Sequence, residues 1–235
     1  MTPLISTRDL SYAYPDGQIA LQSINLTIHR GEKVGLMGAN GAGKSTLLLH
    51  LNGIFAATSG EIKVDGMSVG KKNIQKIRSF IGLVFQNPDD QLFSPTVYDD
   101  VAFGPLYAGL SKQKIEESVQ FALSAVGMAD YCERSPYHLS SGEKKRIAIA
   151  TVLSMHPEIL VLDEPSAGLD PRGRRELIEW LQAQPQTLLI ASHDMDLVQQ
   201  ITQRTIILNH GRIVADGATQ TILSDTPLLF EYGLI

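Results

Sequence analysis

The sequence predicts an α/β fold with a mainly parallel core sheet, an antiparallel β edge layer and a helical insertion. Three nearly all-apolar runs are typical of parallel strands that helices cover on both faces: LVFQ (83–86), ILVLDE (159–164) and TLLIASH (187–193). The alternating runs INLTI (24–28) and GEIKVDG (60–66) instead predict half-buried antiparallel strands. We therefore expect one domain over 1–235, with a core of about 1–86 and 156–235 and a helical subdomain of about 87–155.

Turn chemistry and helical periodicity predict the remaining elements in order along the chain. The YPDG turn (14–17) follows the opening strand. Apolar residues at helical spacing predict helices over 44–55 and over 111–127, the second capped by Ser111. Asp170-Pro171 starts a further helix, because a capping carboxylate precedes proline at the first helical position. Residues 205–217 predict a strand, a tight turn at His210-Gly211 and a second strand.

The bulk composition excludes several classes of protein. A net charge of −5 leaves no basic excess to neutralise phosphates, so nucleic acid is not expected as the main partner. The single cysteine, Cys132, excludes an internal disulfide and fits a reducing compartment. The N-terminus lacks the features of a signal peptide, and no run reaches about 18 apolar residues. We expect a chain of cytosolic character that can still dock on a membrane protein.

A glycine-rich loop between a predicted strand and a predicted helix indicates nucleotide binding. Its glycines allow successive backbone N–H groups to point inward, and the following helix presents the positive end of its dipole to polyphosphate. The lysine is expected to reach the terminal phosphates, and the serine hydroxyl to ligate Mg²⁺. The loop and the start of the helix are Gly38, Ala39, Asn40, Gly41, Ala42, Gly43, Lys44, Ser45 and Thr46.

Two later strands end in polar residues that suit nucleotide hydrolysis. Asp163 closes a buried strand, where a phosphate-loop hydrolase needs a carboxylate for Mg²⁺, and Glu164 is positioned to polarise an attacking water. His193 leaves the next parallel strand at the ligand-binding edge of the sheet. The other five histidines lack metal-ligand spacing, so no transition-metal site is predicted.

The segment HLSSGEKKRIAIATVLSMHPE (138–158) predicts a second anion site. Ser140, Ser141 and Gly142 open a helix, and a helix start built from small residues binds anions well. The chain already has a phosphate loop for its own nucleotide. We therefore expect this second site to complete the nucleotide of a partner chain in a two-fold dimer.

In these motifs and their order, nearly the whole chain resembles the ATP-binding subunits of ABC transporters. The resemblance implies that Tyr14 stacks on adenine, that Gln86 is the Q-loop glutamine, and that LSSGE (139–143) is the signature, with Ser141 and Glu143 in place of the usual glycine and glutamine. It also implies a P-loop ATPase that binds ATP and Mg²⁺. The implied residues are Ser45, Gln86 and Asp163 for Mg²⁺, Glu164 and His193 for catalysis, Ser166 and Asp170 in the D-loop, and Ser140, Ser141, Gly142 and Glu143 acting in the partner's site.

The segment NPDDQLFSPTVYDDVAFGP (87–105) is similar to that of energy-coupling-factor ATPases, especially those of cobalt and nickel importers. A chain that ends soon after the last hairpin favours the same branch. Thr96 and Asp99 have the spacing of a capping box, so 97–103 is expected to be a short helix. Such a short helix cannot bury every apolar residue around it, so we expect a docking patch for a membrane partner at Leu92, Phe93, Val97 and Val101.

The function predicted from the sequence is that of an ATPase subunit that drives a cobalt or nickel importer. Its expected partners are a second ATPase subunit, identical or not, a transmembrane coupling subunit and a substrate-binding membrane subunit. Its expected place is the cytoplasmic face of the inner membrane. A vitamin or another solute is an alternative cargo. A soluble ABC protein of DNA repair or translation is a weaker alternative, because the chain lacks long coiled coils and a second cassette.

Overall fold

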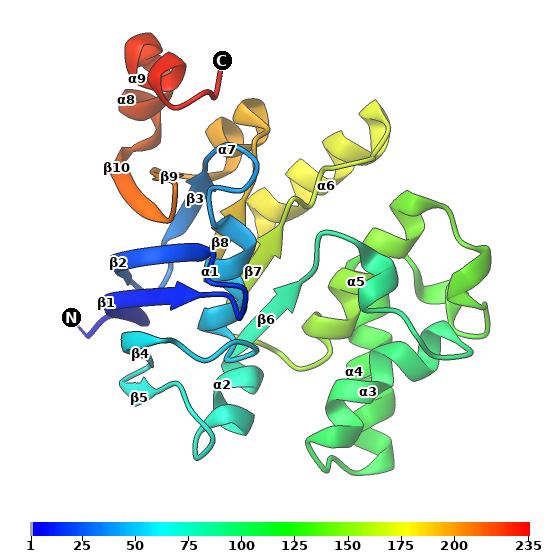
Figure 1. Ribbon diagram of the computed structural model, residues 1–235. Helices are drawn as coiled ribbons and strands as arrows, with labels where there is room; N and C mark the ends of the chain where they lie inside the picture. The colour runs from blue at the N-terminus through cyan, green and yellow to red at the C-terminus, as the bar shows by residue number, and fades with distance from the viewer. Residues whose placement is uncertain (1) are drawn as a thin grey trace.

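The computed structural model describes residues 2–235, and its centre is a six-stranded sheet in the order β10-β9-β3-β8-β7-β6 (Figure 1). All neighbours in this sheet are parallel except β9 and β10. The strands are β3 (Lys33–Met37), β6 (Ile81–Val84), β7 (Ile159–Asp163), β8 (Thr187–Ala191), β9 (Arg204–Asn209) and β10 (Arg212–Ala218). The carboxyl ends of β3, β6, β7 and β8 therefore lie at one edge, where ligands bind in such sheets.

A second, antiparallel sheet covers one side of the first. Its order is β2-β1-β4-β5, formed by β1 (Ile5–Ala13), β2 (Ile19–Ile28), β4 (Ser59–Val64) and the two-residue β5 (Met67–Ser68). Helix α1 (Lys44–Leu51) packs between the sheets, since Leu47, Leu48 and Leu51 share one apolar cluster with residues of both. Helix α2 (Ile74–Phe80) leads into β6.

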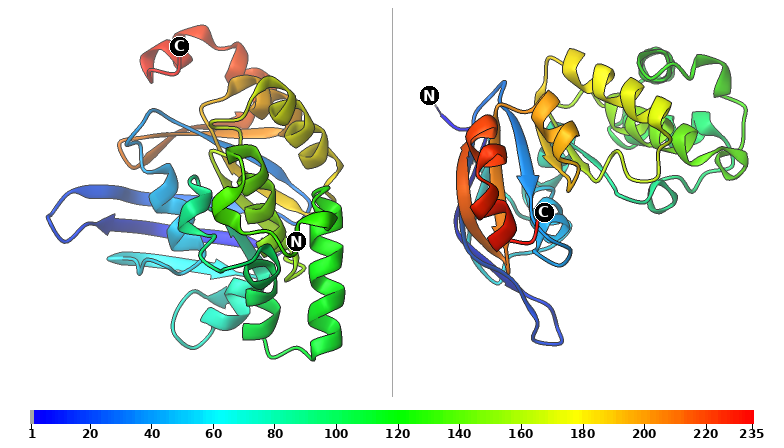
Figure 2. Two further views of the ribbon diagram at one scale, coloured as in Figure 1. Left: turned by 90° about the vertical axis from the view of Figure 1, so that its right-hand side faces the viewer. Right: turned by 90° about the horizontal axis from the view of Figure 1, so that it is seen from above.

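Side chains that alternate along the parallel strands build two separate cores. In β7, Ile159 and Val161 join the cluster under the antiparallel sheet, whereas Leu160 and Leu162 join the cluster on the other face. Helices α6 (Pro171–Ala183) and α7 (Met195–Ile201) cover that other face. The chain ends in α8 (Thr219–Ser224) and α9 (Thr226–Glu231), which pack near β9 and β10 (Figure 2).

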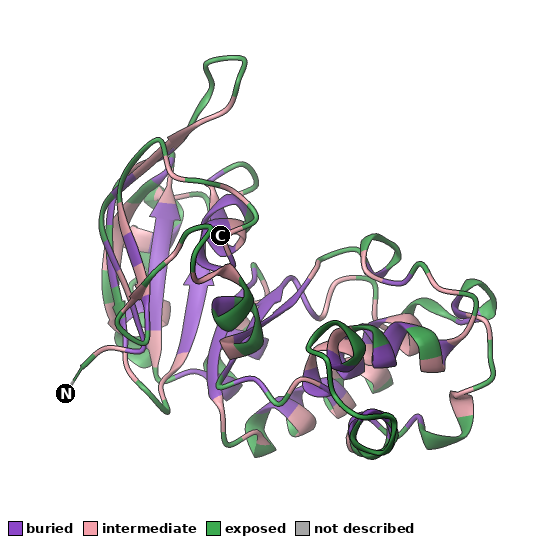
Figure 3. Ribbon diagram, turned by 90° about the horizontal axis from the view of Figure 1, so that it is seen from below, coloured by how far each residue is buried: buried purple, intermediate pink, exposed green. Residues whose placement is uncertain are grey.

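The segment between β6 and β7 forms a helical lobe beside the sheet (Figures 1 and 3). The lobe comprises α3 (Val97–Tyr107), α4 (Lys112–Ala125) and α5 (Ser141–Leu153), with 3₁₀ turns at Pro88–Asp90, Ala129–Tyr131 and Pro136–His138. Helix α3 closely approaches the end of α5 at Gly104, where an added Cβ would lie 2.4 Å from the sulfur of Met155, just after that helix. The lobe thus shares one apolar core with the adjacent face of the sheet, and Lys145 near the start of α5 bonds to the residue that follows β7 at the ligand edge.

The predicted fold class is confirmed, and the differences concern boundaries. Strand β6 ends at Val84, so Gln86 lies beyond it in the loop. Helix α1 ends at Leu51 because Gly53 adopts a left-handed φ of 67°. Helix α3 runs four residues past the predicted end at 103, and its Thr96 cap accepts from the Asp99 N–H as predicted. Within residues 2–235, no helix is both long and apolar enough to cross a membrane.

Candidate active site

The glycine-rich loop between β3 and α1 can be formed only by residues without side chains at two of its positions. Gly38 has a φ of 155°, and a Cβ there would lie 2.3 Å from the Leu208 carbonyl oxygen. Gly43 has a φ of 106°, and a Cβ there would lie 2.6 Å from the Ala20 carbonyl oxygen. The loop is therefore held close against its neighbours, and its backbone turns to face the start of α1.

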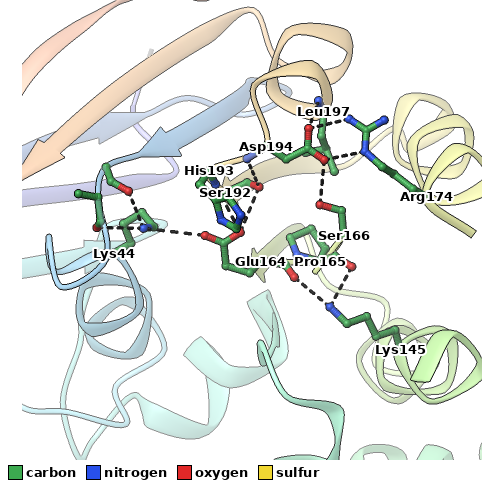
Figure 4. A network of polar contacts seen from close by, with 12 residues as sticks. Lys44, Lys145, Glu164, Pro165, Ser166, Arg174, Ser192, His193, Asp194 and Leu197 are labelled. Atoms are coloured by element: carbon green, nitrogen blue, oxygen red, sulfur yellow. Dashed lines mark hydrogen bonds and ion pairs between the residues drawn. The ribbon is translucent and has the colours of Figure 1, made fainter. Parts of the chain in front are cut away.

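Lys44 is a buried cation at the centre of this loop. Only 7% of the residue is exposed, and its Nζ donates to the carbonyl oxygens of Gly38 at 2.7 Å and Ala39 at 3.3 Å. The same Nζ lies 3.9 Å from the Glu164 Oε1 (Figure 4). A buried ammonium with two weak carbonyl partners can bind polyphosphate strongly, because desolvated opposite charges interact strongly.

Asp163 ends β7 and has oxygen chemistry that fits Mg²⁺. Its Oδ1 is buried and has no hydrogen-bond partner within residues 2–235. Burial raises the pKa of Asp163, and the nearby Ser45 hydroxyl opposes that rise. A buried carboxylate oxygen without a partner, next to a hydroxyl, suits a hard cation that prefers oxygen ligands. Gln86 lines the same cavity from the loop after β6.

Glu164 and His193 lie in direct contact. The Glu164 Oε2 is 2.9 Å from the His193 Nδ1, and it also accepts from the Ser192 hydroxyl at 3.2 Å (Figure 4). Glu164 is 5% exposed and has a left-handed φ of 45°, which is uncommon for a residue with a side chain. This backbone turn directs its carboxylate toward Lys44, where it can accept a proton from a water molecule at the cavity.

A cavity of about 470 Å³ brings these groups together with Tyr14. The Tyr14 hydroxyl lies 2.8 Å from the Thr46 hydroxyl, so the opening strand is attached to the start of α1. The lining residues are Tyr14, Gln18, Ile19, Ala20, Asn40, Gly41, Ala42, Gly43, Lys44, Ser45, Thr46, Gln86, Asp163, Glu164 and His193. Of the sequence-predicted nucleotide residues, only Gly38 and Ala39 are absent from this lining, and both hold Lys44 through their carbonyl groups.

His50 belongs to an aromatic cluster beside Tyr14 that the sequence did not indicate. The His50 ring is fully buried, its Nδ1 lies 2.7 Å from the Thr46 carbonyl oxygen, and its centroid is 4.5 Å from that of Tyr12. Tyr12 in turn stacks on Phe55 and meets Tyr14 edge to face. A histidine at one helical position gives no sequence signal for such packing, because its neighbours come from β1 and the loop after α1.

The signature residues occupy a different cavity, of about 680 Å³. Ser140 caps α5 by accepting from the Glu143 N–H, and the Glu143 carboxylate accepts from the Ser140 N–H at 2.8 Å. The Tyr131 hydroxyl also donates to Glu143 at 2.8 Å, and these contacts, chiefly those with Ser140, lower the pKa of Glu143. The Glu143 charge is thus engaged by its own helix start, while the N–H groups of Ser141 and Gly142 begin the helix.

The D-loop connects to the residue that follows His193. Ser166 donates to the Asp194 carboxylate at 3.1 Å, and Arg174 of α6 binds both Asp194 oxygens, at 2.6 and 2.7 Å (Figure 4). Asp170 caps α6 through the Gly173 N–H at 2.6 Å. Arg174 and Asp194 were missed at the sequence level, because a bidentate pair 20 residues apart has no local spacing signal. Within residues 2–235, no group of three or more His, Cys, Asp or Glu side chains is placed to hold a metal ion.

The predicted docking patch is wrong for three of its four residues. Leu92, Val97 and Val101 are 4%, 0% and 0% exposed and belong to the apolar core that the helical lobe shares with the sheet. The short helix was expected to leave them uncovered, but α4 and α5 both pack against α3 and enclose them. Phe93 is 58% exposed, and it meets the exposed ring of Phe103 edge to face with centroids 5.3 Å apart.

A phosphate loop, a buried carboxylate pair and a histidine at one edge of a parallel sheet define a P-loop nucleotide hydrolase. Comparison with known proteins gives the family. The model of the ABC transporter family matches residues 21–167. The chain is 51% identical over 236 residues to the energy-coupling factor transporter ATP-binding protein EcfA of Methanothermobacter thermautotrophicus, with 98% of this chain and 76% of the relative covered. It is 47% identical to EcfA of Methanocaldococcus jannaschii, covering 98% and 85%.

Solved structures agree with this assignment. CbiO1 from Clostridium perfringens, described as part of the ABC transporter complex CbiONQ, superposes with a TM-score of 0.85 at 38% identity, covering 100% of this chain and 96% of the other. The dimeric ATP-binding cassette MJ0796 bound to ADP and phosphate shares the fold, with a TM-score of 0.83 at 24% identity, covering 92% and 98%. The chain therefore belongs to the ABC transporter family, and it is an ATP-hydrolysing subunit of the energy-coupling-factor type.

Proposed function

We propose that this chain works as a dimer around two ATP molecules and drives the uptake of cobalt or nickel through a membrane importer. The observation that carries this proposal is the separation of its two anion sites. The phosphate loop and the signature helix start line cavities that share no residue. One chain binds its own nucleotide at the phosphate loop, so its second anion site has no ligand within the same chain. A two-fold dimer would place each signature against the partner's nucleotide.

Within each nucleotide site, the residues have distinct roles. Lys44 binds the terminal phosphates, and Tyr14 stacks on adenine. Ser45, Gln86 and Asp163 would hold Mg²⁺, and the ion would supply positive charge against the phosphates. Glu164 polarises the attacking water, and His193 holds that carboxylate in place through their 2.9 Å contact. Ser140, Ser141 and Gly142 bind the partner's nucleotide from the start of α5, and Ser166 and Asp170 support the D-loop beside it.

The membrane partner docks in a groove between the sheet domain and the helical lobe, which we call the coupling groove. Two cavities of about 460 and 350 Å³ form it and share Ile54 and Leu83. Ile54 and Phe103 are 43% and 51% exposed and line these cavities, so the groove offers apolar side chains to a partner. Gln86 lines the groove as well as the nucleotide cavity, so a shift at the nucleotide can reach the partner through one residue.

The cargo is proposed from the resemblance of residues 87–105 to the ATPases of cobalt and nickel importers. The names of the EcfA relatives support an energy-coupling-factor importer in general and do not specify its cargo. The proposed partners are a second ATPase subunit, identical or different, a transmembrane coupling subunit and a substrate-binding membrane subunit. The proposed place of the chain is the inner face of the cell membrane, where it is peripheral.

The test replaces an exposed groove residue and follows assembly and uptake together. Phe103→Asp is expected to abolish co-purification with the membrane subunits and uptake of radioactive cobalt and nickel, because it places a charge in an apolar contact. ATP binding by the isolated chain should stay unchanged. Phe230→Asp is the matched control, since Phe230 is 75% exposed on α9, away from the groove. Normal uptake by Phe103→Asp would refute the coupling groove, and uptake of a vitamin in place of the metals would refute the cargo.

A further inference from the structure

Lys145 of α5 is a buried cation that lines neither the nucleotide cavity nor the signature cavity. The residue is 8% exposed, and its Nζ donates to the carbonyl oxygens of Glu164 at 3.0 Å and Pro165 at 3.2 Å (Figure 4). Burial lowers the pKa of Lys145, and the charges of Glu164 and Asp163 oppose that change. A buried ammonium is costly unless it has a specific partner, so its placement on these two carbonyl groups requires a reason.

Lys145 binds the carbonyl group of Glu164 itself, and the backbone conformation of Glu164 determines where its side chain points. Glu164 has a φ of 45°, a conformation that persists only where surrounding contacts hold it. The Glu164 N–H is fixed to the Ala191 carbonyl of β8 at 2.8 Å. Its carbonyl group is fixed by Lys145 on the opposite side. The sheet and α5 therefore together determine where the Glu164 carboxylate points.

The same helix start lies close to the D-loop at two further points. A Cβ added at Gly142 would lie 3.6 Å from Leu169 Cδ2, and one added at Gly168 would lie 3.7 Å from the Ser141 Oγ. Gly142 and Lys145 are three residues apart and so lie on one face of α5. A movement of the first turn of α5 would therefore act on the Glu164–Leu169 segment, and Lys145 is the side chain of α5 that bonds to Glu164.

We propose that Lys145 is a positioning residue that couples the signature helix to Glu164 of the same chain. A partner's nucleotide bound at the start of α5 then controls how fast this chain's own site hydrolyses ATP. The positioning role rests on the ATPase activity, and the coupling between sites rests on the proposed dimer. Lys145 itself does not touch the substrate. It acts through the Glu164 and Pro165 carbonyl groups.

The first experiment separates positioning from stability in the full chain. Lys145→Met keeps the length of the side chain and removes its donor, so kcat for ATP hydrolysis is expected to fall about 10- to 100-fold with KM changed less than about threefold. Lys145→Gln retains an N–H donor and is expected to restore part of kcat. Lys114→Met, at an exposed position of α4, is the matched control and should match the wild type. An unchanged kcat for Lys145→Met would overturn the proposal, as would a loss of ATP affinity equal to the loss of rate.

The second experiment uses mixed dimers of two differently tagged copies. In a dimer of one Glu164→Gln copy with one otherwise normal copy, both copies can bind ATP and both signatures are intact, but only the normal copy has the carboxylate for hydrolysis. Lys145→Met added to the normal copy should lower its single-turnover hydrolysis about 10- to 100-fold, whereas the same change in the Glu164→Gln copy should leave it unchanged. The reverse pattern would show that Lys145 serves only the signature helix, which contradicts the proposal. If wild-type chains form no ATP-dependent dimer, the proposed assembly fails, and the kcat comparison alone decides the positioning role.

Discussion

Lys44 is the buried charge on which nucleotide binding is expected to depend. Its Nζ is held by two carbonyl groups of its own loop, and no other cation lines the nucleotide cavity formed by the described residues. Lys44→Ala is therefore expected to abolish ATP binding, because the terminal phosphates lose their only ammonium partner. Isothermal titration calorimetry measures this directly, with Lys114→Met as the charge-matched control. Retention of near-normal affinity would contradict the role of the loop.

Glu143 gives a pH dependence whose sign follows from its contacts. Its pKa is lowered from the ordinary 4.5, chiefly by the Ser140 hydroxyl and N–H and then by Tyr131. A lowered carboxylate pKa contributes stability that is present above pH 4.5 and is lost as the pH falls through the folded-state pKa. Glu143→Gln keeps a capping side chain without the charge. We expect it to be less stable than the wild type by a few tenths of a kcal/mol at pH 7.

The measurement is the difference in thermal midpoint between the wild type and Glu143→Gln as a function of pH. The two proteins should converge as the pH falls below 4.5 and through the lowered folded-state pKa of Glu143. A difference that stays constant from pH 7 to pH 3.5 would show that the Glu143 charge adds nothing to the cap.

Single residues were predictable where their chemistry depends on neighbours in sequence. Lys44 and Ser45 follow glycines in one loop, and Asp163 and Glu164 end one apolar run, so local spacing identified them. Lys145 was not predictable, because its partners lie 19 and 20 residues away on another element. Leu92 was placed wrongly for the same reason, since its burial depends on helices that the sequence could not position.

At the scale of elements, α5 combines a capping box with an exposed start that is proposed to bind the partner's phosphates. Gly142→Asp puts a carboxylate where the partner's phosphates are proposed to lie, so hydrolysis should be abolished while ATP binding by the monomer stays intact. The matched control is Gly70→Asp, because a Cβ at Gly70 meets no atom within 4 Å and the backbone there has no left-handed φ. Steady-state hydrolysis and equilibrium binding, measured on both variants, check the prediction. Lost ATP binding by monomeric Gly142→Asp would contradict the division between the two sites.

Elements were predictable where one periodicity dominates. The apolar runs gave β7 and β8, and Ser111 and Asp170 marked the starts of α4 and α6 as the structure has them. The predicted helix ended too early, at 103, because glycine and proline at Gly104 and Pro105 usually end a helix. The close approach of Gly104 to Met155 shows that the glycine is there for packing between helices.

For the whole molecule, the sequence indicated which strands are parallel but not their order. The order β10-β9-β3-β8-β7-β6 places β3 between β9 and β8, which come from the far end of the chain. This arrangement depends on long-range packing, which local sequence patterns do not reveal. That order brings the phosphate loop, Asp163, Glu164 and His193 to one edge. It also leaves the signature helix start exposed in a separate cavity, which is the geometric basis of the proposed dimer.

The most direct test of that dimer is the mass in solution of Glu164→Gln with ATP and Mg²⁺, measured by light scattering. The amide keeps the shape of Glu164 and removes the base, so hydrolysis should slow by about 10²- to 10⁴-fold and leave ATP bound. We predict twice the monomer mass of 25.7 kDa with ATP and the monomer mass without it. The double variant Glu164→Gln with Gly142→Asp should stay monomeric under both conditions. A Glu164→Gln protein that remains monomeric with saturating ATP and Mg²⁺ would contradict the account.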